Sequence, residues 1–133
     1  MNKVIALFTL AVLLAACQET KNQLSPISIE TTQQTYTAGS TVAYTIKNDD
    51  SKPLYISTCD NDQVAVQVRS TLSISSEISS CASMSYISIA PGSSLSGSFQ
   101  FNIAPGEYVI EIMSGSQPDK LLGKVLSNHF TIE

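Results

Sequence analysis

The sequence predicts an all-β domain, a sandwich or a barrel of antiparallel strands. From Ile27 onward apolar residues recur with a period of two, the alternation of half-buried strands, and no segment shows a helical period. Short alternating segments follow one another at intervals of roughly 8–12 residues, separated by Gly, Pro, Asn and Asp. We therefore expect about 7–9 short strands around one core.

The expected strands are separated by recognisable turns. The strands cover 27–31, 41–47, 54–58, 64–70, 84–90, 95–103, 107–113 and 125–132. The turns are expected at 37–40, 48–53, 60–62, 91–92 and 104–106, where turn-forming residues cluster. Between them, 71–83 is rich in serine and is expected to be a loop.

The first sixteen residues have the pattern of an export signal. Lys3 gives a basic start, and Val4 to Ala16 is apolar except for Thr9, which is too short to span a bilayer. Leu14-Ala15-Ala16-Cys17 resembles the lipobox of bacterial lipoproteins. The resemblance implies removal of 1–16, acylation of Cys17 and attachment to the lipid bilayer, whereas an ordinary secretory signal would leave Cys17 incidental. Two or more acyl chains anchor a protein stably.

Residues 17–26 form the expected tether between the lipid and a single domain at 27–133. Gln18 follows the cysteine, and by the family's sorting rule this favours the outer membrane over the inner membrane. Without 1–16 the chain loses Lys3 and carries a net charge of −5, which argues against nucleic acid as a partner.

Cys59 and Cys81 remain as an even pair of cysteines. An exported protein meets an oxidising compartment, so we expect a disulfide between them, with two free thiols as the alternative. Such a bond requires the segment from Leu72 to Ser80 to run back along an edge or face of the domain.

Three segments add a resemblance to immunoglobulin-like domains. Pro105-Gly106-Glu107-Tyr108 places a tyrosine at the start of the penultimate strand, as in the tyrosine corner of those domains. Together with 39–48 and Ala90-Pro91-Gly92-Ser93, it resembles the intracellular proteinase inhibitor (BsuPI) type of domain. The resemblance implies an immunoglobulin-like antiparallel β-sandwich. The chain departs from that type in lacking tryptophan and in carrying a cysteine pair.

The histidine, serines and acidic residues that could take part in catalysis or metal binding are expected to have structural roles. His129 is expected to face solvent beside the inward-facing Phe130, and no serine lies in a Gly-x-Ser-x-Gly elbow. Asp60-Asn61-Asp62 offers too few ligands for calcium and is expected to be a turn. Glu107 and Glu111 are expected to face outward into solvent. We therefore expect no enzyme activity, no cofactor and no metal.

The most favoured function is that of a non-enzymatic module that binds or assembles with an envelope protein. Irregular loops most often carry recognition, and the candidate binding residues lie in three of them: Asn48, Asp49, Asp50, Ser75, Ser76, Glu77, Gln117 and Asp119. The alternative, from the fold resemblance, is a protease inhibitor that presents a loop to a protease cleft.

Overall fold

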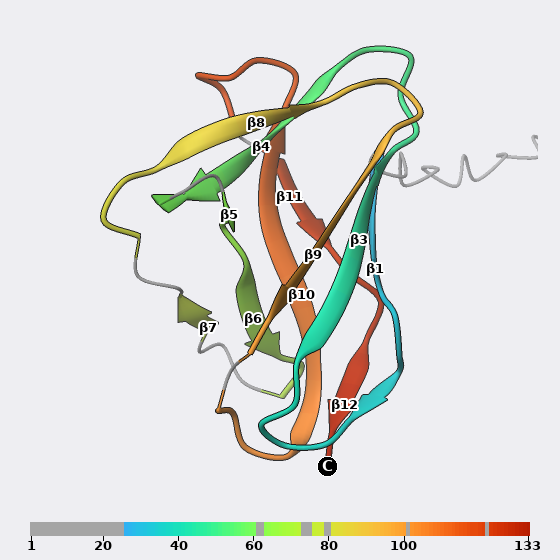
Figure 1. The fold of residues 1–133 in the computed structure, drawn as a ribbon, viewed down its shortest axis with the longest axis vertical. Helices are drawn as coiled ribbons and strands as arrows, with labels where there is room; N and C mark the ends of the chain where they lie inside the picture. The colour runs from blue at the N-terminus through green and yellow to red at the C-terminus, as the bar shows by residue number, and fades with distance from the viewer. Residues whose placement is uncertain (1–25, 61–62, 73–75, 79–80, 101, 122) are drawn as a thin grey trace, which may run out of the picture.

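The fold is a β-sandwich of two sheets that lie over one another (Figure 1). The computed structural model describes residues 26–60, 63–72, 76–78, 81–100, 102–121 and 123–133; for 76–78 it describes the backbone only. The predicted signal, Cys17 and most of the tether therefore lie outside the described residues. The all-β prediction is confirmed. Of the sandwich and the barrel that the sequence allowed, the structure has the sandwich.

The smaller sheet has the order β1-β3-β9 and is antiparallel throughout. Its strands are β1 (Ile27–Thr31), β3 (Val42–Asn48) and β9 (Ser94–Phe99). Alternate residues of β3 face the interior, since Val42, Tyr44 and Ile46 are buried. This is the period of two that the sequence shows.

The larger sheet is organised around the long strand β10 (Gly106–Gly115). Along one edge β10 pairs with β12 (Phe130–Ile132) and β11 (Gly123–Leu126), and along the other with β6 (Gln67–Ser70) and β4 (Leu54–Cys59). β8 (Ser85–Ile89) extends the sheet beyond β4. β2 (Thr35–Tyr36), which the sequence pattern did not predict, pairs in parallel with β12.

The segment after β4 departs from the expected path. The prediction of a continuous strand over 64–70 that returns along β4 is wrong, because within 63–70 only β5 (Gln63–Val64) pairs with β4. Ala65 and Val66 belong to no strand, and β6, which follows them, pairs with β10 instead. β7 (Ser76–Ile78) runs back along the outer edge of β6. The expectation that 72–80 follows an edge of the domain is confirmed for these described residues.

A single core fills the space between the sheets. Phe130, Ile46, Ile56, Ile110 and Ile112 are its most deeply buried apolar side chains. They come from both sheets and from strands far apart in the sequence, so the core forms only when the two sheets meet.

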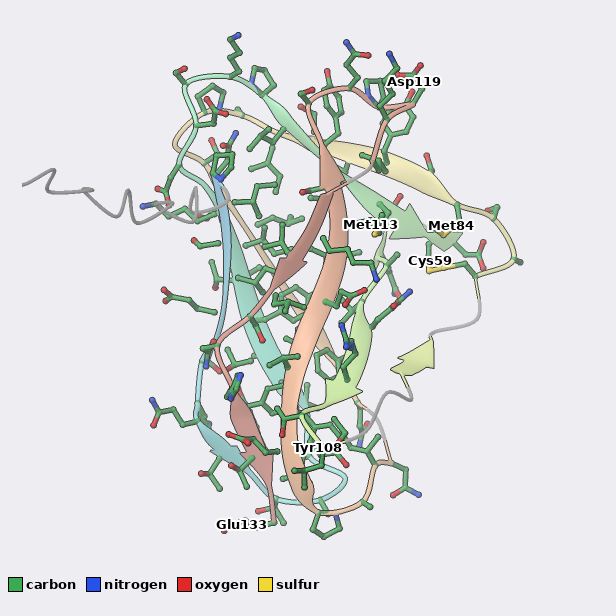
Figure 2. All side chains as sticks on the ribbon, turned by 180° about the vertical axis from the view of Figure 1, so that it is seen from behind. Cys59, Met84, Tyr108, Met113, Asp119 and Glu133 are labelled. Atoms are coloured by element: carbon green, nitrogen blue, oxygen red, sulfur yellow. A yellow bond between two sulfur atoms is a disulfide. The ribbon has the colours of Figure 1, made fainter. Side chains whose placement is uncertain are left out.

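The end of the sandwich that holds Tyr108 has the predicted corner. The hydroxyl of Tyr108 donates a hydrogen bond to the carbonyl oxygen of Ala104, four residues upstream, at 2.7 Å. Figure 2 shows Tyr108 at this end, near the C-terminal Glu133. This bond is the tyrosine corner of immunoglobulin-like sandwiches, and the described fold is consistent with that class.

Candidate functional site

The first predicted binding loop, 48–53, contains a residue that serves the fold. Asn48 is fully buried, and its amide nitrogen donates to the carbonyl oxygens of Lys52 and Ile89, both at 2.9 Å. Its side-chain oxygen accepts from the backbone N–H of Asp50 at 2.8 Å. Asn48 therefore departs from the expectation of a surface residue: it links the loop to the end of β8.

The aspartates of this loop differ from Asn48 because they reach the surface. Asp49 is exposed and pairs with Lys47 at 2.5 Å. Asp50 accepts hydrogen bonds from the backbone N–H of Lys52 and the hydroxyl of Ser51, both at 3.3 Å. Both carboxylates are thus used within the turn, although Asp49 remains accessible.

The other predicted binding residues lie in separate parts of the fold. Ser75 is outside the described residues, whereas Ser76 and Glu77 belong to the edge strand β7. Gln117 and Asp119 are exposed in a tight turn in which the N–H of Lys120 donates to the carbonyl oxygen of Gln117. The structure therefore does not bring the three predicted loops into one described site.

Cys59 and Cys81 form a disulfide, with their Cα atoms 5.2 Å apart. Asp60, next to Cys59, reinforces the link: its carboxylate accepts from the backbone N–H groups of Ala82 and Ser83 at 3.2 and 3.0 Å. The hydroxyl of Ser83 donates to the same carboxylate at 2.8 Å. These hydrogen bonds, first that of the Ser83 hydroxyl, lower the pKa of Asp60. The carboxylate is thus engaged in holding the chain that leads into β8.

The outer face of the larger sheet carries a cluster of charges that the sequence did not reveal. The prediction that Glu111 faces freely into solvent is wrong, because its side chain is only 3% exposed. One carboxylate oxygen accepts from Arg69 and the other pairs with Lys124, each at 2.8 Å. Burial acts to raise the pKa of Glu111, but the hydrogen bonds and charges of Lys124 and Arg69 outweigh it and lower the pKa.

A second polar group lies further along this face. Nδ1 of His129 is 3.2 Å from one carboxylate oxygen of Glu107, and the hydroxyl of Thr71 donates to the other at 3.0 Å. His129 is exposed, as predicted. The hydroxyl contacts the carboxylate and not the imidazole, so the three residues lack the order of a nucleophile, base and orienting acid.

An irregularity between β11 and β12 places His129 on this face. Glu111 pairs with Leu126, but Tyr108 pairs with Phe130, so one extra residue lies between the two pairs. This is a β-bulge, and it changes which side chains point outward. In a regular strand Leu126 and His129, three positions apart, would face opposite sides of the sheet. Because of the extra residue, both side chains face outward here. At the bulge the hydroxyl oxygen of Ser127 accepts a hydrogen bond from the backbone N–H of Ile110 at 2.8 Å, so this N–H keeps a partner.

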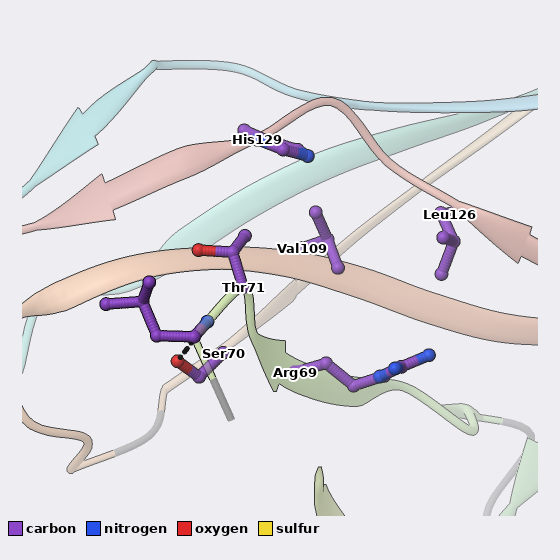
Figure 3. Close-up of a pocket in the computed structure, with 7 residues that line it drawn as sticks. Arg69, Ser70, Thr71, Val109, Leu126 and His129 are labelled. Carbon is purple, nitrogen blue, oxygen red and sulfur yellow. Dashed lines mark hydrogen bonds between the residues drawn. The ribbon is translucent and has the colours of Figure 1, made fainter. Parts of the chain in front are cut away.

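A surface pocket of about 410 Å³ lies where β6, β10 and the bulge meet (Figure 3). In this view Val109 projects from β10, His129 lies on one side of that strand and Arg69 on the other, and the side chain of Thr71 overlies the ribbon of β10. The residues lining it are Arg69, Ser70, Thr71, Leu72, Val109, Leu126 and His129. Among these described residues two are basic and none is acidic. We take this pocket and its rim as the candidate site.

The described residues hold no group of three or more His, Cys, Asp or Glu side chains placed to bind a metal ion. Within the same ranges, no helix has the length and apolar character needed to cross a bilayer. The arrangement at the pocket is suited to holding a ligand through charge, hydroxyl groups and apolar contact.

Comparison with known proteins supplies little further information. No family model matches the chain, and no curated protein matches it. Among solved structures, it is similar to a Pseudomonas fluorescens alkylpurine DNA glycosylase AlkC bound to DNA, at 13% identity over 81% of this chain, with a TM-score of 0.41. It is also similar to a Listeria innocua β-glucosidase, at 13% identity over 80% of this chain, with a TM-score of 0.38. The matches span only 30% and 16% of those chains, and neither likeness bears on function.

Proposed function

We propose that this protein is a lipid-anchored module of the cell envelope, favouring the outer membrane, that binds another envelope protein without catalysing a reaction. The observation that carries the binding role is the outer face of the larger sheet. There Leu72 and Leu126 are 90% and 51% exposed beside a pocket with basic side chains. Exposed apolar side chains rimmed by polar groups mark interaction surfaces.

The anchor is tested separately from the binding role. The intact protein, purified from membranes, should carry diacylglycerol on Cys17 by mass spectrometry and should start at that residue. A Cys17→Ser variant should be released from membranes, because no acyl chain holds it. An unmodified amino end at residue 17 would contradict the anchor and leave the surface argument to stand alone.

The binding role is tested by photocrosslinking in intact envelopes. A photoreactive amino acid at Leu72 or Leu126 should give a discrete crosslinked band. The same group at Ser98, exposed on the outer face of the smaller sheet, serves as the matched control. If Leu72, Leu126 and Ser98 give the same pattern, or no band at all, the proposed surface is wrong.

The alternative of a protease inhibitor is favoured by the turn at 116–121. Gly115 lies so close to this turn that a Cβ there would overlap the carbonyl oxygen of Lys120, so the turn packs back on β10. A turn held in this way is suited to presenting a fixed loop to a protease. A panel of purified proteases decides: loss of their activity at micromolar concentrations of this protein would support inhibition, and full activity would exclude it.

A further inference from the structure

We propose that the pocket on the outer face receives an acidic, extended segment of the partner protein. A carboxylate of the segment binds the guanidinium of Arg69, a backbone N–H of the segment donates to Nε2 of His129, and a neighbouring apolar side chain lies over Val109 and Leu126. This inference rests on the proposed binding function and names the chemistry of its partner.

The charges of the pocket favour an anion. Its described lining contains Arg69 and His129 and no acidic side chain, in a chain whose net charge is −4. The nearest acids are already engaged: Glu111 by Arg69 and Lys124, and Glu107 by Thr71 and His129. Arg69 and Lys124 share the single carboxylate of Glu111, so this end of the outer face carries one unbalanced positive charge that a ligand carboxylate can balance, whereas the negative charge of Glu107 lies at the other end, beside His129.

The donors are also positioned to act on a ligand. A guanidinium has five N–H donors, and the hydrogen bond to Glu111 uses Nη1 of Arg69. That bond fixes the orientation of the group, which lowers the entropy lost when a second carboxylate binds. The carboxylate of Glu107 can only accept, so Nδ1 of His129 donates to it, and Nε2 on the opposite edge of the ring is left to accept a backbone N–H of the segment.

The apolar part of the site is built by the fold. Val109 is on the outward side of β10 but is only 7% exposed, so it forms the apolar bottom of the pocket, with neighbouring side chains around it. The bulge brings Leu126 to the same face as His129. Leu72 and Leu126, which line the pocket from different strands or loops, are both strongly exposed, and so broad an apolar surface fits a segment of a protein better than a compact small molecule.

The inference is tested by NMR titration of the mature protein, as purified from membranes, in detergent micelles. The probe is the acetylated and amidated tetrapeptide Gly-Leu-Glu-Gly, compared with peptides that carry Gln or Lys in place of Glu. The acidic peptide should shift the backbone amides of Thr71, Val109 and Leu126, with a dissociation constant on the order of 1 mM. The Gln peptide should bind at least about fivefold more weakly, and the Lys peptide more weakly still.

Variants then assign the contacts. Arg69→Gln and His129→Gln should each weaken binding of the acidic peptide, and the second is safe for folding because His129 is exposed. Lys47→Gln removes a cation from the smaller sheet and should leave binding unchanged. Equal shifts with all three peptides, shifts confined to other residues, or equal weakening by Lys47→Gln would overturn the inference. If photocrosslinking at Leu72 succeeds while the acidic peptide fails, the binding function stands and only the acidic partner is excluded.

Discussion

The phenol ring of Tyr44 lies against the backbone of Gly97, its direct partner across the pair of strands β3 and β9. A Cβ at Gly97 would overlap the hydroxyl oxygen and ring of Tyr44. The ring thus occupies the space that a side chain on β9 would fill, and it also contacts the ring of Phe99 with their centroids 6.1 Å apart. The glycine in this strand is there to admit the aromatic ring.

Replacing this glycine should destabilise the domain. Gly97→Ala forces the ring of Tyr44 from its position in the core, and we expect a loss of about 1–3 kcal/mol in the free energy of unfolding. Urea denaturation followed by circular dichroism measures it. Ser98→Ala, at the next position and exposed, is the matched control and should cost less than about 0.5 kcal/mol. Equal stability of the two variants would show that the ring can move aside without cost.

Burial of Tyr44 should make the domain sensitive to alkali. Desolvation raises the pKa of Tyr44 to about 12. An unfolded tyrosine ionises near pH 10, so the unfolded state loses its proton first. The contribution of this group to stability is complete below about pH 10 and is lost as the pH rises toward 12. The free energy of unfolding should fall less steeply over this range in Tyr44→Phe, and identical slopes would contradict the assignment.

The side chain of Asn48 should be essential for stability. Removing it in Asn48→Ala leaves the carbonyl oxygens of Lys52 and Ile89 and the N–H of Asp50 without this partner. We expect a loss of about 2–4 kcal/mol, since buried polar groups become unsatisfied. Thermal unfolding compares it with Asp49→Ala, an exposed neighbour whose loss should have little effect. A wild-type melting temperature for Asn48→Ala would contradict the role given to these bonds.

The ion pairs of Glu111 should contribute to stability at neutral pH and lose that contribution in acid. The pKa of Glu111 is lowered in the folded state, so its contribution is present above the unfolded pKa of about 4.3 and is lost as the pH falls through the folded value. Because Arg69 and Lys124 are partly exposed, we expect Glu111→Gln to cost only about 1–2 kcal/mol at pH 7. Denaturation at pH 7 and pH 3 measures both values. The difference between wild type and variant should shrink at the lower pH, and a constant difference would contradict the linkage.

Removal of the disulfide should destabilise the domain without changing its sheets. The double variant Cys59→Ser/Cys81→Ser frees the chain between residues 59 and 81, and we expect a loss of about 2–4 kcal/mol. The hydrogen bonds of Asp60 to Ala82 and Ser83 remain available to order the segment. Circular dichroism should therefore keep its β-sheet signal while the melting temperature falls. An unchanged melting temperature would mean that Asp60 alone holds the segment.

Much of the architecture follows from local sequence pattern. The strand around Tyr44 alternates strictly, the turn formers at 48–53 separate it from the strand around Ile56, and Pro105-Gly106 marks the start of the strand around Ile110, so the existence and approximate bounds of these strands were predictable. The bond from Tyr108 to Ala104 follows from a short motif. β2 and β7 contain only Thr35–Tyr36 and Ser76–Ile78, too few residues for alternation to be recognised, and their pairing depends on distant strands.

The candidate site was harder to predict because it is made by neighbours across the sheet. Nothing near Glu111 in the sequence indicates burial, and its partners Arg69 and Lys124 come from two other strands. The bulge that turns His129 outward together with Leu126 becomes visible only when both are paired with β10. The predicted sites were assigned to loops, whereas the pocket lies on strands, where alternation alone does not reveal the register between them.

The parallel pairing of β2 with β12 has a consequence for how the domain is made. It joins Thr35, close to the start of the domain, to Thr131, close to its end. A second contact joins equally distant parts of the chain: the backbone N–H of Thr31 donates to the side-chain oxygen of Asn128 at 2.8 Å. During synthesis β2 cannot pair with β12 until Phe130–Ile132 has left the ribosome, so the larger sheet of this domain is completed late. Until then β2 lacks its partner strand, whereas β1, β3 and β9 can already pair with one another.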